Sequence, residues 1–430
     1  MSSFRTHLIG ACGLAMAFTL SVARANPEPV PVPVSGTDGP SLTLRQAIES
    51  TLRSNPALQV FAFELRAQDA RIQQAGLRPA PTLGAEVENI LGSGETRGVD
   101  AAEATFSLSQ IVELGNKRDR RMSAANLARE SMGVEQQAAQ LDVLAEVTRR
   151  FIHVASDQAQ LELTRRGAQL TQTTVEGVTR RVQAGRSPDV ELIRAQAALT
   201  RAHIDQRHAE HELLASRRKL AAMWGEPEAA FGTVVADLYR LAQPAEFDAL
   251  VSRLKENPDF LRFASEARLR DAEIRLAEAQ RRPDIEFSAG VRRLQDSRDQ
   301  AFVLGASVPL FSRRQAAPAI AEARALRGQV DAEQHAAFVN ARAQVFELYQ
   351  ELRHAIDETQ ILQREVLPQM EQALKQTEYA YERGRYSYLE LVEGQRAYLD
   401  TQRALIEAAA TGQTLQAEIE RLTGESLKPL

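Results

Sequence analysis

Residues 82–111 read TLGAEVENILGSGETRGVDAAEATFSLSQI, with alternating apolar and polar residues at both ends and a loop rich in Gly, Ser and Asp between them. A period of two places the apolar residues of each alternating segment on a single face: Leu83, Ala85 and Val87 in the first, and Ala104, Phe106 and Leu108 in the second. Each segment has about 9 to 10 residues, the length at which a tilted strand crosses a bilayer. The stretch therefore predicts a pair of membrane strands.

The same pattern returns in the second half of the chain. Residues 284–309 hold a second alternating pair, Asn55-Pro56 returns as Asn257-Pro258, and Gly185-Arg186 returns as Gly384-Arg385. Several matches that occur in the same order in both halves of the chain predict a duplicated unit. We expect repeats at 42–226 and 247–425, with a linker at 227–246 and a tail at 426–430.

Long helices are predicted after each strand pair. Residues 114–183 contain no proline, and a return helix is expected at 187–223, with Ser187 as its N-cap. The second repeat predicts the same pair at 314–383 and 387–423. A helix also precedes each strand pair. In the first repeat, the number of residues in this helix and in the return helix together equals the number in the long helix. Two short helices stacked end to end would therefore line one long helix.

Composition and strand number define the fold class. The chain is 44% hydrophobic, only 5% aromatic and 25% charged, which favours long helices with narrow seams. Four strands cannot close a membrane barrel alone, because bacterial barrels start at eight. The sequence predicts a mainly α protein in which duplicated long-helix hairpins form a helical barrel. Its four strands would join those of two other copies in a small 12-stranded membrane β-barrel.

The N-terminus predicts export from the cytoplasm. Residues 1–25 have a basic start, an apolar run and a small-x-small cleavage site, as in a signal peptide, and 26–41 form a proline-rich tether. Lipidation of Cys12 is the less favoured alternative, because little apolar sequence precedes it.

The chain resembles the outer membrane efflux protein family, the TolC-like channels, over residues 42 to 424. The resemblance rests on the paired Asn-Pro segments, the strand pairs, and the motifs at 184–192 and 383–391. It implies a homotrimeric channel in outer membrane lipid, with most of the chain in the periplasm. A periplasmic adaptor protein and an inner-membrane RND pump would be its partners. The adaptor is expected to meet the hairpin tips, formed by Gly185, Arg186, Ser187, Gly384, Arg385, Tyr386 and Ser387.

Other chemistry finds little support in the sequence. There is no phosphate-binding Gly-rich loop, no His-Glu-x-x-His and no nucleophile elbow, so we expect neither an enzyme nor a cofactor. The net charge of -5 does not favour nucleic acid. His203, His208 and His211 share a helix, but without a third converging ligand they are interpreted as a solvated face and not as a metal site.

Basic residues gather where strands meet helices. The hypothesis is a basic collar facing anionic lipid headgroups, and the alternative is that these residues pair with local acids or face the lumen. Its members are Arg78, Lys117, Arg118, Arg121, Arg281, Arg282, Arg313 and Arg314. Asp357 and Glu358 are expected to form an acidic gate near the tip.

The cargo is predicted from resemblance alone. Residues 109–118 resemble the strand-to-helix segment of the CzcC-like branch, which implies export of divalent heavy-metal cations. The alternatives are a drug or small-organic channel of the same family, and a periplasmic coiled-coil adaptor that does not enter the membrane.

Overall fold

The computed structural model describes residues 39–424. The expected signal peptide, Cys12, nearly all of the tether and the tail at 426–430 lie outside the described residues. Within 39–424, no helix is both long enough and apolar enough to cross a membrane.

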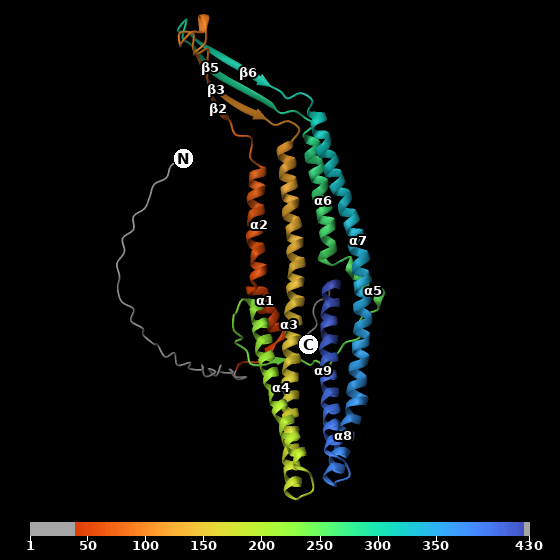
Figure 1. Ribbon diagram of the computed structural model, residues 1–430. Helices are drawn as coiled ribbons and strands as arrows, with labels where there is room; N and C mark the ends of the chain where they lie inside the picture. The colour runs from red at the N-terminus through yellow and green to blue at the C-terminus, as the bar shows by residue number, and fades with distance from the viewer. Residues whose placement is uncertain (1–38, 425–430) are drawn as a thin grey trace, which may run out of the picture. The chain divides into compact units, whose positions relative to one another are not determined.

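Each repeat has a short helix, a longer helix, a strand pair and a helical hairpin in the same order (Figure 1). The helices of the first repeat are α1 (Leu44–Ser54), α2 (Pro56–Ala75), α3 (Lys117–Gln183) and α4 (Asp189–Ala221). Those of the second are α5 (Phe247–Leu254), α6 (Pro258–Ala279), α7 (Ser312–Ile361), α8 (Leu367–Glu382) and α9 (Tyr388–Thr423). The strands lie at one end of the long helices and the hairpin turns at the other.

Helices α2 and α4 both pack along α3, and they meet end to end at Asn55. The Asn55 side-chain oxygen caps α2 by accepting from the backbone N–H of Ala57 at 2.9 Å. Its Nδ2 donates to the carbonyl of Met223, just beyond α4, at 2.7 Å. Asn257 makes the same joint in the second repeat, donating to the carbonyl of Arg421 at 2.8 Å. The predicted end-to-end stacking is therefore found for α2 and α4, but the single helix expected before the strands is two helices, because Asn55 ends α1 and begins α2.

The second long helix runs without a gap from Ser312 to Glu382, within two residues of the predicted 314–383, but it contains one π-helical turn that was not predicted. A π-helical segment, Leu362–Val366, separates α7 from α8, and Pro368 follows it. Proline has no N–H to donate and its ring crowds the preceding turn, so the helix widens there. The first long helix begins at Lys117, three residues later than expected, because Gly115 and Asn116 are left-handed.

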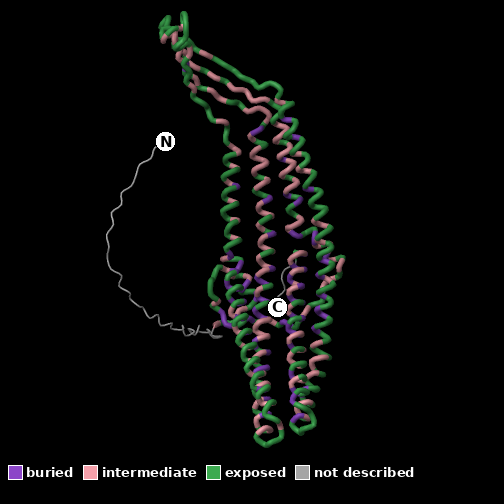
Figure 2. The backbone as a smooth tube through the Cα atoms, viewed as in Figure 1, coloured by how far each residue is buried: buried purple, intermediate pink, exposed green. Residues whose placement is uncertain are grey.

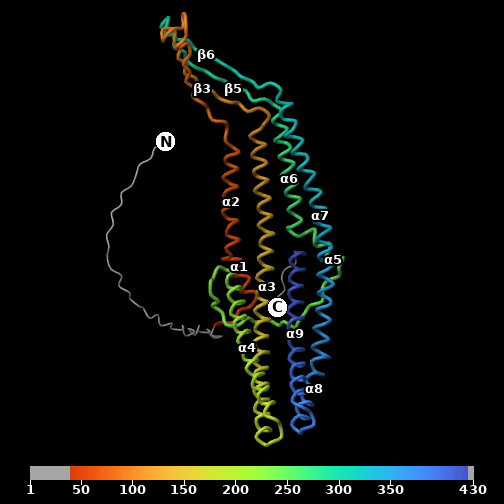
Figure 3. The backbone as a smooth tube through the Cα atoms, in the orientation of Figure 1, coloured from red at the N-terminus to blue at the C-terminus, as the bar shows by residue number. Residues whose placement is uncertain are grey.

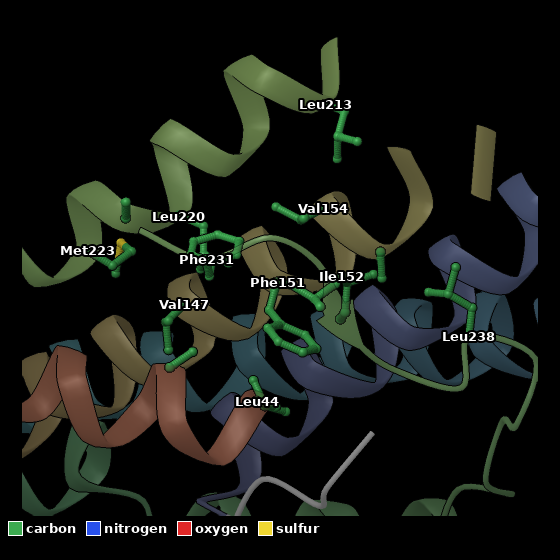
Figure 4. Packing of buried hydrophobic residues seen from close by; sticks show 14 of the residues in the cluster. Leu44, Val147, Phe151, Ile152, Val154, Leu213, Leu220, Met223, Phe231 and Leu238 are labelled. Atoms are coloured by element: carbon green, nitrogen blue, oxygen red, sulfur yellow. The ribbon is translucent and has the colours of Figure 1, made fainter. Parts of the chain in front are cut away.

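The predicted linker at 227–246 belongs to the core. Its Phe231, Val234 and Leu238 are buried with Phe151 and Ile152 of α3 (Figure 4). The backbone N–H of Val234 donates to the side-chain oxygen of Gln158 of α3 at 2.7 Å, which fixes this segment against the helix. Two-residue strands β1 (Leu42–Thr43) and β4 (Val234–Val235) pair here in parallel. Figure 2 shows buried residues gathered around this middle region, while the strands and turns are mostly intermediate or exposed.

Candidate functional site

The four strands of the two repeats form one antiparallel sheet. They are β2 (Thr82–Glu88), β3 (Glu103–Val112), β5 (Ile285–Leu294) and β6 (Gln300–Ser307), in the order β2-β3-β5-β6. Pairing of β3 with β5 joins the repeats, and β2 and β6 are the open edges of this sheet. The predicted strand segments correspond to these strands within about two residues at most boundaries. The exception is 82–91, because β2 ends at Glu88.

One face of the sheet is apolar and exposed. The register aligns Ala85 with Phe106, Phe106 with Val291, and Val291 with Phe302. Phe106 is 63% exposed and Phe302 is 88% exposed. We call this surface the apolar face: Leu83, Ala85, Val87, Ala104, Phe106, Leu108, Phe287, Ala289, Val291, Phe302, Leu304 and Ala306. The inward–outward alternation of a membrane strand requires such a face.

The opposite face is polar and lined by small residues. A Cβ on Gly290 would lie 2.6 Å from the carbonyl oxygen of Phe106, so only glycine fits there. Arg292 crosses this face and bonds Glu103 at 2.8 Å, Glu88 at 3.0 Å and the Thr105 hydroxyl at 2.9 Å. The guanidinium therefore ties β2, β3 and β5 together on the side that would face a lumen.

The joint between β3 and α3 is fixed by residues of both repeats. Gly115 and Asn116 are left-handed, with φ of 80° and 57°, and turn the chain sharply. Asp284, which directly precedes β5, accepts from the backbone N–H of Leu114 at 3.1 Å and from Nζ of Lys117 at 2.7 Å. Lys117 is only 4% exposed. The segment that resembles the CzcC-like branch is therefore a structural joint between sheet and helix.

The structure divides the predicted basic collar into two groups. Lys117 pairs with Asp284, Arg118 donates to the Gly76 carbonyl at 2.6 Å, and Arg121 pairs with Glu113. These three make the local bonds that the alternative interpretation expected. The remaining members are exposed: Arg78, Arg281, Arg282, Arg313 and Arg314.

Glycine residues end the long helices at the hairpin tips, and the structure corrects one predicted cap. The two hairpin turns lie at the end of the long helices opposite the strands (Figure 3). Gly185 and Gly384 have φ of 66° and 73°, the left-handed conformation expected at the end of a long helix. Ser387 caps α9 with a full capping box to Glu390. Ser187 does not cap α4, because Pro188 occupies the N-cap position, and the Ser187 hydroxyl accepts from Arg181 instead at 3.1 Å. Arg186, Arg385 and Tyr386 are exposed.

Arg181 and Tyr381 link the two hairpins beside the tips, and the sequence did not indicate this contact. The Arg181 guanidinium lies 4.5 Å from the centre of the Tyr381 ring and donates to the Tyr381 carbonyl. Burial raises the pKa of the Tyr381 phenol, although Arg181 opposes that shift. A cavity of about 420 Å³ lies beside this contact and is lined by Arg180, Glu378 and Glu382 among others. Contacts between hairpins are tertiary, so no local pattern reveals them.

Asp357 and Glu358 do not lie at the tip, which corrects the expected position of the gate. Both are exposed on α7, ahead of the π-helical segment. Between Glu358 and Gly384 the chain runs about 40 Å along its helix axis. The acids that line the cavity beside the tip are Glu378 and Glu382.

The histidines show no convergence on a metal. His203, His208 and His211 are exposed on α4, and Nε2 of His208 lies 3.2 Å from Glu212. Across the part of the chain that the structure describes, no three His, Cys, Asp or Glu side chains form a group that could hold a metal ion.

Two long helical hairpins attached to one end of a sheet with an exposed apolar face define the class: a membrane channel subunit with a large helical part outside the bilayer. The family model described as outer membrane efflux protein matches residues 47–226 and 249–425. The chain belongs to this family of transport channels, and this membership excludes the adaptor alternative.

Individual relatives agree with this assignment. The cobalt-zinc-cadmium resistance protein CzcC of Cupriavidus metallidurans is 28% identical over 96% of this chain and 98% of its own length. The nickel-cobalt-cadmium resistance protein NccC of Alcaligenes xylosoxydans xylosoxydans is 24% identical over 69% of each chain. Among solved structures, a membrane protein from Pseudomonas aeruginosa has the same fold, with a TM-score of 0.72 at 19% identity, covering 89% of this chain and 93% of that one.

Proposed function

We propose that the protein is the outer membrane channel of a tripartite efflux system that exports divalent heavy-metal cations. The observation that carries this proposal is the similarity to CzcC along almost the whole of both chains. The adaptor and an inner-membrane RND pump would supply cargo and energy. The channel would need no cofactor.

The surfaces of one chain support a closed trimer. Helix α3 is covered by α2 and α4 of its own repeat and by α6 and α9 of the other. Helix α7 packs on α5, α6 and α9, yet it exposes Val339 at 51% and Phe346 at 49%. Within one chain, the second repeat packs on α3 of the first through α6 and α9. A second copy could pack its first repeat on α7 in the same way.

The sheet edges point to the same closure. Strand β6 of one copy could pair with β2 of the next, which satisfies the open backbone groups that lipid would leave unpaired. Three copies supply twelve strands, above the minimum of eight. The apolar face would then meet lipid, and the face with Gly290 and Arg292 would line the pore.

The proposed transport is passage through a water-filled duct. A tight metal site in the wall would slow release, so selection of the metal would take place in the pump. The exposed hairpin tips, held by left-handed glycines, are the proposed contact with the adaptor.

Deletion of the gene, followed by growth on zinc, cobalt, cadmium, nickel and copper and on a drug panel, tests the cargo. We expect lower tolerance to one or more of the metals and unchanged tolerance to drugs. Loss of drug tolerance alone would contradict the metal assignment and favour the small-organic alternative. Complementation with the wild-type gene controls for effects on neighbouring genes.

A further inference from the structure

The junction between β6 and α7 exposes two large apolar side chains in an unfavourable backbone setting. Leu310 is 71% exposed and Phe311 is 77% exposed. Phe311 has φ of 64°, a left-handed conformation that is uncommon outside Gly, Asn and Asp. The matching N-cap position of α3 holds Asn116, which tolerates it. A bulky aromatic residue here costs stability without burying its ring in the chain.

Two exposed arginines follow Phe311 closely in sequence, and two more follow α6, the helix that packs along α7. Arg313 and Arg314 lie in the first turn of α7, where cations oppose the helix dipole, so they do not serve the helix. Arg281 and Arg282 follow α6. None of the four has an ion-pair partner within residues 39–424, in contrast to the paired Lys117 and Arg121 of the first repeat.

We propose that this junction is an anchor at the inner-leaflet surface of the outer membrane. Leu310 and Phe311 lie at the boundary of the acyl chains, and Arg281, Arg282, Arg313 and Arg314 bind lipid phosphate groups. We call these six residues the junction anchor. The anchor rests on the proposed membrane placement of the sheet.

Position and chemistry both support a lipid partner. The apolar face runs down β6 through Phe302 and Leu304 and reaches the junction a few residues later. Aromatic residues concentrate at the membrane interface. Arginines bind phosphate through paired N–H groups, and each basic residue near an anionic surface strengthens binding about fivefold at low salt.

Tryptophan quenching measures the depth of the anchor. The only tryptophan of the chain, Trp224, is first replaced by phenylalanine, and the further variants are made in this Trp224→Phe protein. Phe311→Trp, Phe302→Trp and Tyr386→Trp then report the junction, the apolar face and the tip. Each variant is reconstituted as the assembled channel into vesicles containing phospholipids brominated on the acyl chain near the carbonyl.

We expect quenching at positions 302 and 311 and none at position 386. Quenching at 302 without quenching at 311 would overturn the anchor and leave the proposed function intact. No quenching at 302 would show instead that the sheet does not enter the bilayer, and the proposed function would fail with the anchor.

Phe311→Asn separates anchoring from folding. Asparagine suits the left-handed backbone, so stability in detergent should be unchanged or higher, while retention of co-purified phospholipid falls. A lower trimer yield in detergent would contradict the anchor, because it would mean that a neighbouring copy covers Phe311.

Lipid selectivity tests the arginines. Replacement of Arg281, Arg282, Arg313 and Arg314 by glutamine should reduce the preference of the assembled channel for phosphatidylglycerol over phosphatidylcholine by more than tenfold in native mass spectrometry. The matched control replaces four exposed arginines on α1 and α4, away from the strand end: Arg45, Arg53, Arg207 and Arg218. An equal loss in both variants, or no loss in either, would overturn the phosphate assignment.

Discussion

The ion pair between Lys117 and Asp284 should respond unequally to the loss of each partner. The side chain of Lys117 is 5% exposed and that of Asp284 is 32% exposed, with 2.7 Å between them. Asp284→Ala leaves a buried ammonium without a counter-charge and the Leu114 N–H without an acceptor. Lys117→Met removes the buried charge and keeps most of the stem, while water can reach the remaining carboxylate.

The expected costs follow from this burial. Breaking a buried pair costs about 3 to 5 kcal/mol, and the partial exposure of Asp284 places Asp284→Ala near the lower limit, at about 3 kcal/mol. Lys117→Met should cost about 1 kcal/mol, the usual value of one hydrogen bond. Asp284→Asn keeps both acceptor bonds and should fall between them.

Equilibrium urea unfolding in detergent, followed by circular dichroism, measures the three free energies and that of the double variant. The double variant should be more stable than Asp284→Ala alone, because no buried charge is left uncompensated. Equal costs for Lys117→Met and Asp284→Ala, or strict additivity in the double variant, would refute the reasoning.

Three further predictions concern the tips and the interface between copies. Gly185→Val with Gly384→Val should abolish export and leave the trimer intact, because the left-handed backbone costs about 1 to 2 kcal/mol per site; the matched asparagine pair should retain export, and adaptor cross-linking checks both. Val339→Glu should lower trimer yield on unheated gels while leaving the helical content of the chain unchanged, and full trimer yield would contradict the proposed role of α7. Bonds from the Ser387 backbone N–H and hydroxyl lower the pKa of Glu390, so the cap of α9 should be present above the ordinary carboxyl pKa and be lost as pH falls through the lowered value. The protection of amide groups near the tip against hydrogen exchange, relative to the intrinsic rate at each pH, should therefore fall in acid, and Glu390→Gln should remove that dependence.

The spacing of apolar residues and the positions of glycine predicted features that depend on local sequence. The alternation around Phe106 and Phe302 identified strands, because a strand with one exposed apolar face needs period two. Gly185 and Gly384 identified the helix ends, because glycine adopts the left-handed turn at no steric cost. Asn55-Pro56 was recognised as a repeat match and not as a helix start, although asparagine is a common cap and proline suits the first helical position, where the structure begins α2.

Features that depend on contacts between distant residues were not predictable in this way. Lys117 looks like one more exposed cation in sequence, and only Asp284, 167 residues away, explains its burial. The region at 227–246 looks like a linker because its apolar residues have no period, yet Phe231 is buried against α3. Pro368 was a local signal for the π-helical turn in the second long helix, but Pro318 lies inside α7 without such a turn, so a proline alone does not identify one.

The asparagine joints restrict how the length of this protein can change during evolution. Asn55 binds the carbonyl just beyond α4 and the first amide groups of α2, so the summed length of these two helices must match the stretch of α3 beside them. Each residue inserted into α3 lengthens it by about 1.5 Å and would pull this joint apart unless α2 or α4 gains a residue too. The second repeat has the same constraint at Asn257. A longer or shorter duct therefore requires matched insertions or deletions at four places in one gene, and a single one would break the wall.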